Sequence, residues 1–284
     1  MILEAHGKIN LSLDITGIRE NGYHEVEMVM QSVALCDFVS IEKNNSGKIS
    51  VSSDKPQIPT GRKNIAYKAC ELMKSTYNLD CGFDIFIEKH IPMAGGMAGG
   101  STDAAAVIRG INELCELGLT QDKLMELGLK IGADVPFCIH QKPALAKGLG
   151  EELTKVCGLS EDVYILLVNP NKEISTKKVY ELFDEKGDFN QVDNESLVLA
   201  LYSGDAHKAS KYMKNVLSPI SSSICPEICD INEKLLSMGA FFSMMSGSGA
   251  TCFGLFYDMP DLDLAHKIFG NYYVSLTKPV NFNN

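Results

Sequence analysis

The sequence predicts a protein of mixed helices and strands that is built in two parts. Residues 83, 85 and 87 are apolar and recur at the period of a half-buried strand. A glycine-rich loop follows this strand and leads into a helical pattern that runs to about Leu117. Residues 163–168 are a continuous apolar run of strand length, which is consistent with a buried strand that opens a second half. With 284 residues and 45% hydrophobic content, the chain is long enough for one large or two modest domains.

The chain begins with extended segments. Residues 2–15 alternate between apolar and polar side chains, which predicts a strand with Lys8 and Asn10 on its polar face. The pair lines a cleft or faces solvent, and the solvated sheet face is the commoner case for such a strand. A hairpin signal at 20–22 is followed by a second extended run over 23–41.

Tyr23 and His24 come directly after this tight turn. A histidine beside a tyrosine is usually structural. Side chains that follow a tight turn are also easily aimed at a ligand. From these residues alone, both the structural and the functional interpretation stay open.

The next elements lead to the glycine-rich loop and away from it. Residues 47–51 predict a short strand and 52–60 a polar loop, and from 62 to 78 apolar residues recur at helical spacing. After the loop helix, Thr120 is a good helix start, and the pattern that follows it ends before Gly132.

The segment from Pro92 to Ala106 is the most informative part of the sequence. Ser101 or Thr102 can cap the helix that follows its glycines. The first turn of a helix leaves N–H groups unpaired and carries partial positive charge, so a strand, a glycine loop and a helix start together favour an anion site. The alternative is a surface loop before a well-capped helix. The segment lacks the Lys-Ser or Lys-Thr pair of the Walker loop and the spacing of the dinucleotide fingerprint, so we predict a phosphate loop of a third kind.

Asp134 lies between the end of a helical pattern and the short apolar run 135–139, where a charged residue is normally avoided. A carboxylate in this position is either a turn or cap acceptor, or a catalytic base.

The second half alternates helices and strands. We place the boundary near 155–162, which gives parts 1–158 and 159–284, although no change of composition marks it. Within 241–257 we expect a strand, a turn at 246–250 and a second strand. The remaining elements are helices at 175–183, 194–202, 206–215, 226–238 and from 261, and a last strand at 272–278.

Composition narrows the classes of partner. A formal charge of −10 argues against a nucleic-acid or anionic membrane surface, which needs clustered Lys and Arg. The first residues lack the basic and apolar regions of a signal peptide, and no uncharged run reaches membrane length, so we expect a cytoplasmic protein. Nine scattered cysteines indicate reduced thiols. Cys225 and Cys229 have no second Cys or His pair nearby, so we expect no zinc site there.

Five segments, which keep the order of the family, resemble four motifs of the GHMP kinases (galacto-, homoserine, mevalonate and phosphomevalonate kinases). Residues 92–106 are similar to the second motif of this family. Lys8–Leu11 together with Gly22–Glu25 resemble the first motif, Gly132–Phe137 the catalytic-aspartate segment, and Ser246–Ala250 the third motif. Their detailed form is similar to that of the members that act on a cytidine-diphosphate-linked polyol.

This resemblance implies an α+β, two-domain GHMP kinase fold with substrate and ATP in the cleft between the domains. Residues 1–158 would form an ATP-binding domain like domain 2 of ribosomal protein S5, and 159–284 a ferredoxin-like domain. It also implies transfer of the ATP γ-phosphate to the 2-hydroxyl of 4-diphosphocytidyl-2-C-methyl-D-erythritol, in the non-mevalonate route to isopentenyl diphosphate. The alternatives are a homoserine or mevalonate type of kinase, or a catalytically silent nucleotide-binding module. Small molecules are the expected partners, and the expected state is a monomer or weak homodimer.

The resemblance assigns roles to individual residues. Asp134 is implied as the general base, with Lys8 as its electrostatic partner at the attacking oxygen. The residues implied in ATP binding are Lys89, Pro92, Met93, Ala94, Gly95, Gly96, Met97, Ala98, Gly99, Gly100, Ser101 and Thr102. Those implied in substrate binding are Asn10, Tyr23, His24, Tyr180, Gly247, Ser248 and Gly249, with cytosine between the rings of Tyr23 and Tyr180.

The expected metal and three departures from the family pattern complete the resemblance. Mg²⁺ is expected with ATP, and Ser101, Thr102 and Asp103 are its candidate ligands, although Asp103 serves equally well as a helix stabiliser. Ala98 stands where the family usually has glycine, as Met97 stands for leucine, and a positive φ at Ala98 would be strained. His6-Gly7 also replaces the more usual Pro-Ala before Lys8.

Overall fold

The computed structural model describes residues 1–186 and 188–282. By their contacts, the residues group into two compact units, each made of several chain segments. Unit 1 contains 1–7, 36–91 and 98–141, and unit 2 contains 8–35, 92–97 and 142–284. This grouping differs from the expected division at residue 158, because residues 8–35 belong with the C-terminal part. The division into domains 1–158 and 159–284 stays a prediction.

Unit 1 contains a sheet whose central strand is the second half of β3. That strand pairs with β5 in antiparallel register from Phe38 opposite Glu88 to Asn44 opposite Gly82, and β4 runs parallel to β5. Met1 and Ile41 exchange backbone hydrogen bonds at the start of β1, which also pairs with β3. The strands are β1 (Ile2–Asn10), β3 (His24–Asn44), β4 (Ile49–Ser53) and β5 (Gly82–Glu88).

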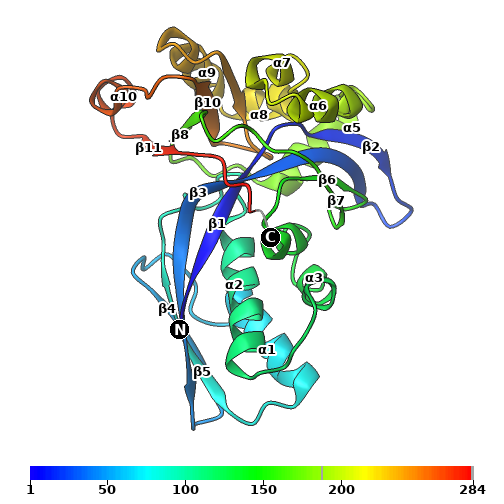
Figure 1. Ribbon diagram of the computed structural model, residues 1–284, viewed down its shortest axis with the longest axis vertical. Coiled ribbons are helices and arrows are strands. Elements are labelled where there is room, and N and C mark those ends of the chain that lie inside the picture. Colours follow the sequence, from blue (N-terminus) through cyan, green and yellow to red (C-terminus); the bar gives the residue numbers. More distant parts are fainter. Residues whose placement is uncertain (187, 283–284) are drawn as a thin grey trace. The chain divides into compact units, whose positions relative to one another are not determined.

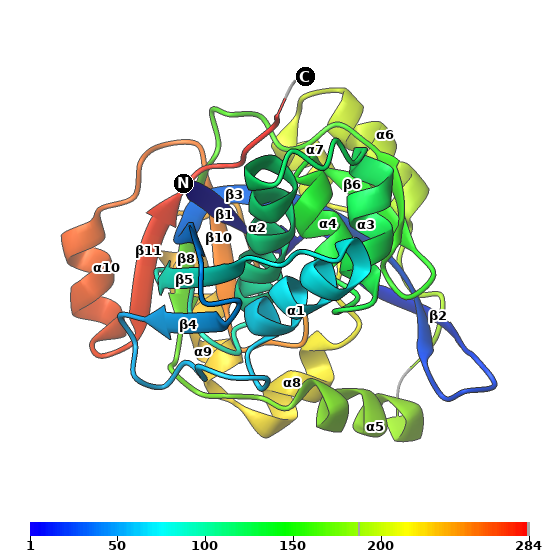
Figure 2. The same ribbon diagram turned by 90° about the horizontal axis from the view of Figure 1, so that it is seen from below.

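Helices cover the apolar face of this sheet (Figures 1 and 2). Val39, Ile41 and Ile85 are buried with alanines of α1 and α2 in one hydrophobic core. Small side chains allow the two helices to pack closely on the strands. The helices of unit 1 are α1 (Ile65–Tyr77), α2 (Gly99–Leu114), α3 (Gln121–Leu129) and α4 (Val135–His140).

The start of α2 corrects one prediction. Neither Ser101 nor Thr102 caps the helix, because it begins earlier, at Gly99, after Ala98. The Thr102 hydroxyl instead donates to the carbonyl of His6 at 2.8 Å. By contrast, the predicted cap at Thr120 is confirmed, since its side chain accepts from the Lys123 N–H group.

Unit 2 has two sets of strands. The first half of β3 pairs with β2 and β6, and β6 pairs with β7. A four-stranded antiparallel sheet has the order β11-β8-β10-β9, and α9 packs on β9 and β10. These strands are β2 (Asp14–Ile18), β6 (Ala144–Lys147), β7 (Glu152–Lys155), β8 (Tyr164–Asn169), β9 (Phe242–Met245), β10 (Cys252–Phe256) and β11 (Tyr273–Thr277). The helices are α5 (Thr176–Lys186), α6 (Asn194–Tyr202), α7 (Ala206–Ser210), α8 (Ser218–Ile224), α9 (Glu227–Ser237) and α10 (Leu262–Phe269).

Early and late residues of the chain meet within unit 2. Ala34 donates its N–H to the carbonyl of Lys278 at 2.9 Å, and Leu13 forms a β-bridge with Asn215. That bridge explains why the helix expected over 206–215 ends at Ser210, since the chain is extended at Asn215. The single strand expected over 2–15 is likewise interrupted between β1 and β2.

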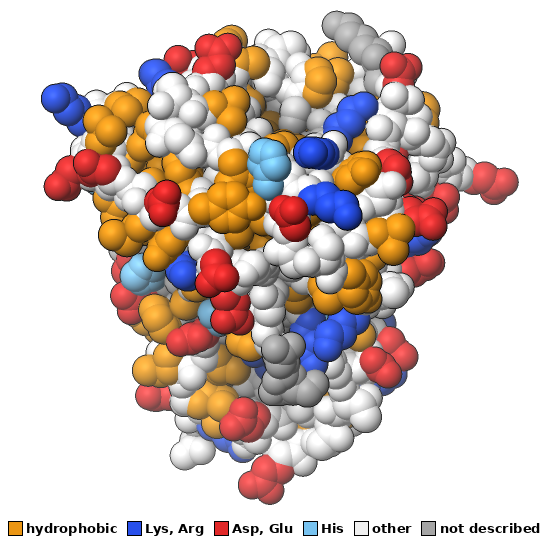
Figure 3. All heavy atoms as spheres, turned by 45° about the horizontal axis from the view of Figure 1, so that its top comes forward, with side chains coloured by type: hydrophobic (Ala, Val, Ile, Leu, Met, Phe, Trp, Pro, Cys, Tyr) orange, Lys and Arg blue, Asp and Glu red, His pale blue; other side chains and the backbone are white. Residues whose placement is uncertain are grey.

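The surface and the helix lengths bear on possible partners. On the face shown in Figure 3, the described Lys and Arg side chains are interspersed with Asp and Glu. Such mixing does not provide the clustered positive charge that nucleic acids need. Among the described residues, no helix combines the length and apolar character needed to cross a bilayer.

Candidate active site

The first half of the glycine segment, residues 92–97, packs against the turn that contains the third glycine motif. The Gly95 carbonyl accepts from the Thr251 N–H at 3.2 Å, and the Gly96 carbonyl accepts from the Ser246 hydroxyl at 3.0 Å. A Cβ on Gly96 would lie 2.2 Å from the Ser246 carbonyl oxygen, so only glycine fits there. Within unit 2, two distant glycine-rich segments therefore form one backbone surface.

Lys8 and Asn10 join the same cluster and share one face of β1, as predicted. The Lys8 N–H donates to the Met97 carbonyl at 3.2 Å, and the Asn10 N–H donates to the Ser246 hydroxyl at 3.2 Å. The Lys8 ammonium donates to Asn10 Oδ1 at 2.6 Å and is buried. No carboxylate among the described residues of unit 2 pairs with it. A buried cation without a countercharge is costly, so the position favours an anionic ligand.

The second half of the glycine segment, in unit 1, starts helix α2. Ala98 is the N-cap with φ 59° and ψ 26°, and it provides no side-chain cap. The first turn contains no acidic residue. The Thr102 N–H donates to the Ala98 carbonyl at 2.9 Å, so the N–H groups of Gly99, Gly100 and Ser101 are the ones that suit an anion, and the helix dipole adds favourable charge.

Asp134 lies in unit 1, directly before α4. It is half-buried and occupies the N-cap position, but its side chain forms no capping hydrogen bond. Of the two interpretations of this carboxylate, the helix-cap role is therefore not supported. The carboxylate keeps its lone pairs for another partner, as a general base requires.

The candidate substrate residues His24 and Tyr180 meet in unit 2. Their ring centroids lie 4.7 Å apart, and the His24 ring nitrogen lies 2.6 Å from Asp184 Oδ1. The Tyr23 side chain is 63% exposed. Thus His24 itself contacts Tyr180, and Asp184 sets the position of its ring. Sequence reasoning missed Asp184, although it lies one helical turn after Tyr180 and on the same face of α5.

Lys89 has a different environment from the one expected of a nucleotide ligand. Its ammonium is buried and forms ion pairs with Asp37 and with Asp103, the latter at 2.8 Å. Burial lowers the pKa of Lys89, but the charges of Asp103 and Asp37 outweigh this effect, and the net pKa is raised. Lys89 is therefore charged and already paired within the protein, and its role in ATP binding stays a prediction.

The candidate ligands of Mg²⁺ differ in their availability. The Thr102 hydroxyl is bonded to the His6 carbonyl, and Asp103 is buried against Lys89. Ser101, which is half-buried, is therefore the most accessible of the three. A separate group, Glu4 with His6 and Cys36, has ligand atoms within 4.8 Å of one another. Nitrogen and sulfur ligands do not suit Mg²⁺, and burial, with Glu4 and Asp37, raises the pKa of the Cys36 thiol to about 11.

Known protein families match two separate stretches of the chain. The description "GHMP kinases N terminal domain" matches residues 64–142, and "GHMP kinases C terminal" matches 197–274. A 4-diphosphocytidyl-2-C-methyl-D-erythritol kinase from Clostridioides difficile is 45% identical over 93% of this chain and 90% of its own length. One from Acetivibrio thermocellus is 47% identical over 93% of each chain.

The chain belongs to the 4-diphosphocytidyl-2-C-methyl-D-erythritol kinase family of GHMP kinases.

Solved structures agree with the family assignment. A crystal structure of 4-(cytidine 5'-diphospho)-2C-methyl-D-erythritol kinase is similar with a TM-score of 0.77 and 27% identity, over 98% of this chain and 99% of the other. A mevalonate kinase structure has a TM-score of 0.72 at 12% identity, with coverage of 99% and 100%, and shows the shared fold alone. The predicted α+β GHMP kinase fold is confirmed.

The third motif of this GHMP kinase is held by surrounding polar groups. The Asn215 amide donates to the Gly247 carbonyl at 2.8 Å, and the Ser221 hydroxyl donates to the Ser248 carbonyl at 2.9 Å. The Ser248 hydroxyl lies 2.8 Å from that of Thr176. These bonds fix the turn that includes Gly249, so residues 247–249 present a rigid backbone surface to the glycine segment.

Proposed function

We propose that this protein transfers the γ-phosphoryl group of ATP to the 2-hydroxyl of 4-diphosphocytidyl-2-C-methyl-D-erythritol. The substrate name is that of relatives which are 45% and 47% identical over nearly the full chain. This step would place the protein in the non-mevalonate route to isopentenyl diphosphate. The observation that carries the proposal within the structure is the hydrogen-bonded grouping of Lys8 and Asn10 with both glycine segments, together with the burial of the Lys8 ammonium.

The proposed reaction needs a base, a cation and a phosphate cradle. Asp134 would take the proton from the substrate hydroxyl, whose oxygen then forms a bond to the γ-phosphorus as the bond to the β–γ bridging oxygen breaks and ADP leaves. Lys8 would stabilise negative charge on the attacking oxygen and the γ-phosphate. Residues 92–102 would hold the phosphates through backbone N–H groups of residues 93–101, because Pro92 has no N–H and that of Thr102 donates to the Ala98 carbonyl at 2.9 Å.

The cytidine end would bind at His24 and Tyr180. In the proposed complex, cytosine lies between the rings of Tyr23 and Tyr180, and His24 donates or accepts a hydrogen bond at the base edge. The bond between His24 and Asp184 supports this role, because it holds the imidazole in one orientation. The exposed ring of Tyr23 is free to close over a base.

Mg²⁺ would accompany ATP and neutralise charge on the β- and γ-phosphates. Such sites usually combine one or two protein groups with phosphate oxygens and water. Ser101 fits this pattern as a hydroxyl in the first turn of α2. A cytoplasmic location and a monomeric or weakly dimeric state stay predictions from the sequence.

A coupled assay of ADP release tests the proposal. We expect turnover with the cytidine-diphosphate-linked alcohol and background rates with homoserine or mevalonate. Turnover of either of the other alcohols in preference would replace the proposed substrate, and ADP release with none of them would favour a nucleotide-binding module without kinase activity.

A further inference from the structure

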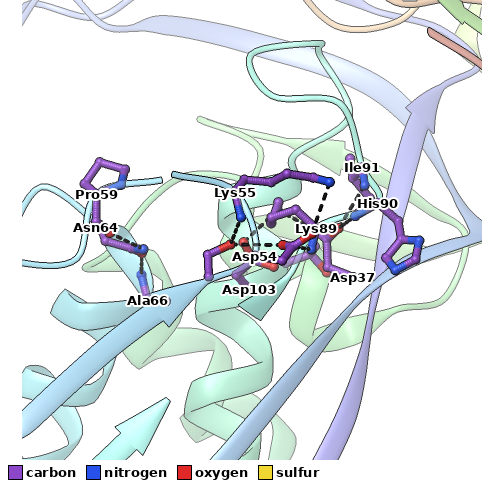
Figure 4. Close-up of polar contacts among 12 residues, drawn as sticks. Asp37, Asp54, Lys55, Pro59, Asn64, Ala66, Lys89, His90, Ile91 and Asp103 are labelled. Atoms are coloured by element: carbon purple, nitrogen blue, oxygen red, sulfur yellow. Dashed lines mark hydrogen bonds and ion pairs between the residues drawn. The ribbon is translucent and has the colours of Figure 1, made fainter. Parts of the chain in front are cut away.

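Three consecutive backbone N–H groups, those of residues 89–91, are held by carboxylates where the chain leaves β5. The Lys89 N–H donates to Asp54 Oδ1 at 2.9 Å. The N–H groups of His90 and Ile91 both donate to Asp37 Oδ1, at 2.6 and 2.8 Å. Figure 4 shows these bonds converging on the end of the strand. Hydrogen bonds to charged acceptors are strong, so this stretch is fixed immediately before Pro92.

The side chain of Lys89 links this fixed stretch to helix α2. Its ammonium contacts Asp37 on β3 and Asp103 on α2, and the three side chains are at most 7% exposed. Gly99 lies close to the same ammonium, because a Cβ there would meet Lys89 Nζ at 3.3 Å and Ile91 Cγ2 at 3.1 Å. The first residue of α2 is thus packed on Lys89 and Ile91.

Residues 92–97 leave unit 1 and return to it between these two anchored points. The chain departs after Ile91 and re-enters at Ala98, one residue before α2. Both points are held by the Lys89 ammonium. Because this ammonium is buried, water is excluded from its ion pairs, and breaking them is costly. A loop whose ends are held together loses less conformational freedom when it binds a ligand.

We propose that Asp37, Lys89 and Asp103 form a clamp that closes the neck of the glycine segment and so positions its backbone for phosphate. Lys89 is a positioning residue in this proposal and does not contact the nucleotide. The link to phosphate rests on the proposed function, whereas the effect of the clamp on the order of residues 92–101 does not.

The contacts of Asp37 support this role. Its Oδ2 accepts from the Lys89 ammonium, which also donates to Asp103 Oδ2 at 2.8 Å. Its Oδ1 accepts from the N–H groups of His90 and Ile91. One buried carboxylate therefore holds both the Lys89 side chain and the backbone that precedes Pro92.

The test compares three variants by hydrogen exchange and by binding of Mg²⁺ with a non-hydrolysable ATP analogue. Lys89→Met removes the link, and Asp103→Asn keeps the shape and the ammonium but weakens the link. The double variant tests coupling. Lys123→Met is the matched control, because Lys123 is an exposed lysine of unit 1 that also pairs with a carboxylate, Glu126.

We expect faster exchange in residues 92–101 of both single variants without ligand, with little change in β8 or α9. The affinity for the analogue should fall about tenfold or more in Lys89→Met and severalfold in Asp103→Asn. The double variant should be no weaker than Lys89→Met, because interactions within one network are not additive. Lys123→Met should match the unmodified protein. If Lys89→Met does not fold, the isosteric Asp103→Asn still tests the clamp.

Direct contact between Lys89 and phosphate would give a different pattern. Hydrogen exchange in residues 92–101 would be unchanged in both variants. The affinity for the analogue would fall in Lys89→Met but not in Asp103→Asn, because Lys89 is still present there and is released from one carboxylate. That result would overturn the clamp. If the unmodified protein binds no analogue, the proposed function fails, and the exchange measurements still decide whether the neck is closed by these residues.

Discussion

At the residue scale, the environment of each charged side chain distinguishes the candidate roles. Lys8 and Lys89 are both buried lysines. Lys89 is paired with two carboxylates, whereas Lys8 contacts the neutral Asn10. An ammonium whose protein partner is neutral favours an incoming anion more than one that is already paired. Lys8 is therefore the better candidate for contact with the reacting phosphate.

Replacement of Asp134 tests the proposed base. Asp134→Asn should lower kcat by about 10²–10⁴, as expected for loss of a general base. Stability should change little, because the carboxylate does not cap α4. Steady-state ADP release gives kcat, and urea unfolding gives stability. An unchanged kcat would exclude Asp134 as the base.

Asp184 tests the cytidine site. Loss of a charged hydrogen bond to His24 costs about 1.5–3 kcal/mol, so Asp184→Asn should raise the KM for the cytidine-linked alcohol by about tenfold or more. The KM for ATP should stay constant. Glu181→Gln, which changes an exposed acid on the same helix, is the control. Equal effects on both KM values would contradict a role confined to this substrate.

Asp103 predicts a pH dependence of stability. Its folded-state pKa is raised to about 8 by burial, with Lys89 opposing and Asp37 reinforcing this shift. An acid with a raised pKa holds its proton longer in the folded protein, so the free energy of unfolding falls as pH rises from about 4 through 8. The difference in stability between the protein and Asp103→Asn should follow this slope and level off above about pH 9. Urea titrations across this range measure it.

At the scale of elements, helix α2 begins with strain. Ala98 and Ala94 both have positive φ, at 59° and 49°. A left-handed residue with a Cβ costs roughly 1–2 kcal/mol relative to glycine. The predicted strain at Ala98 is therefore present, and it lies where the chain re-enters unit 1.

Substitutions at Ala98 test the strain. Ala98→Gly removes it but increases the freedom of the unfolded chain, so stability should rise by at most about 1 kcal/mol. Ala98→Val should destabilise the protein by more than about 1 kcal/mol, because β-branched residues adopt this conformation poorly. Urea unfolding checks both. A stable Ala98→Val variant would show that α2 can begin differently.

The helices and strands differ in how well the sequence predicted them. Strong periodicity predicted α1, α2 and β5 near their observed bounds. The hairpin of β6 and β7 was missed because each strand has only four residues, and α8 because serines and Pro219 dominate it. The site motifs could be found from their spacing. The ion pairs of Lys89 could not, because Asp37 lies 52 positions away in the chain.

At the scale of the whole molecule, the two units share strands of one chain. Residues 24–35 of β3 belong to unit 2 and residues 36–44 to unit 1. Strand β1 is likewise divided after Gly7. A fragment of residues 159–284 would lack the partners of Lys278, Asn215 and Leu159 in the first 35 residues.

We therefore expect that this fragment does not fold alone. Circular dichroism and amide exchange should show little protected structure, whereas addition of a separate 1–158 fragment should restore part of it. Cooperative unfolding of the isolated fragment would contradict this dependence and would favour an autonomous C-terminal domain.

The divided strands also bear on how such a protein can change through recombination. An exchange of gene segments at the middle of the chain would separate residues that share hydrogen bonds, such as Ala34 and Lys278. Hybrids with a distant relative would need matched partners on both sides of the crossover. We therefore expect the N-terminal and C-terminal halves of the chain to be inherited together, and sequence variation to accumulate by substitution within each half.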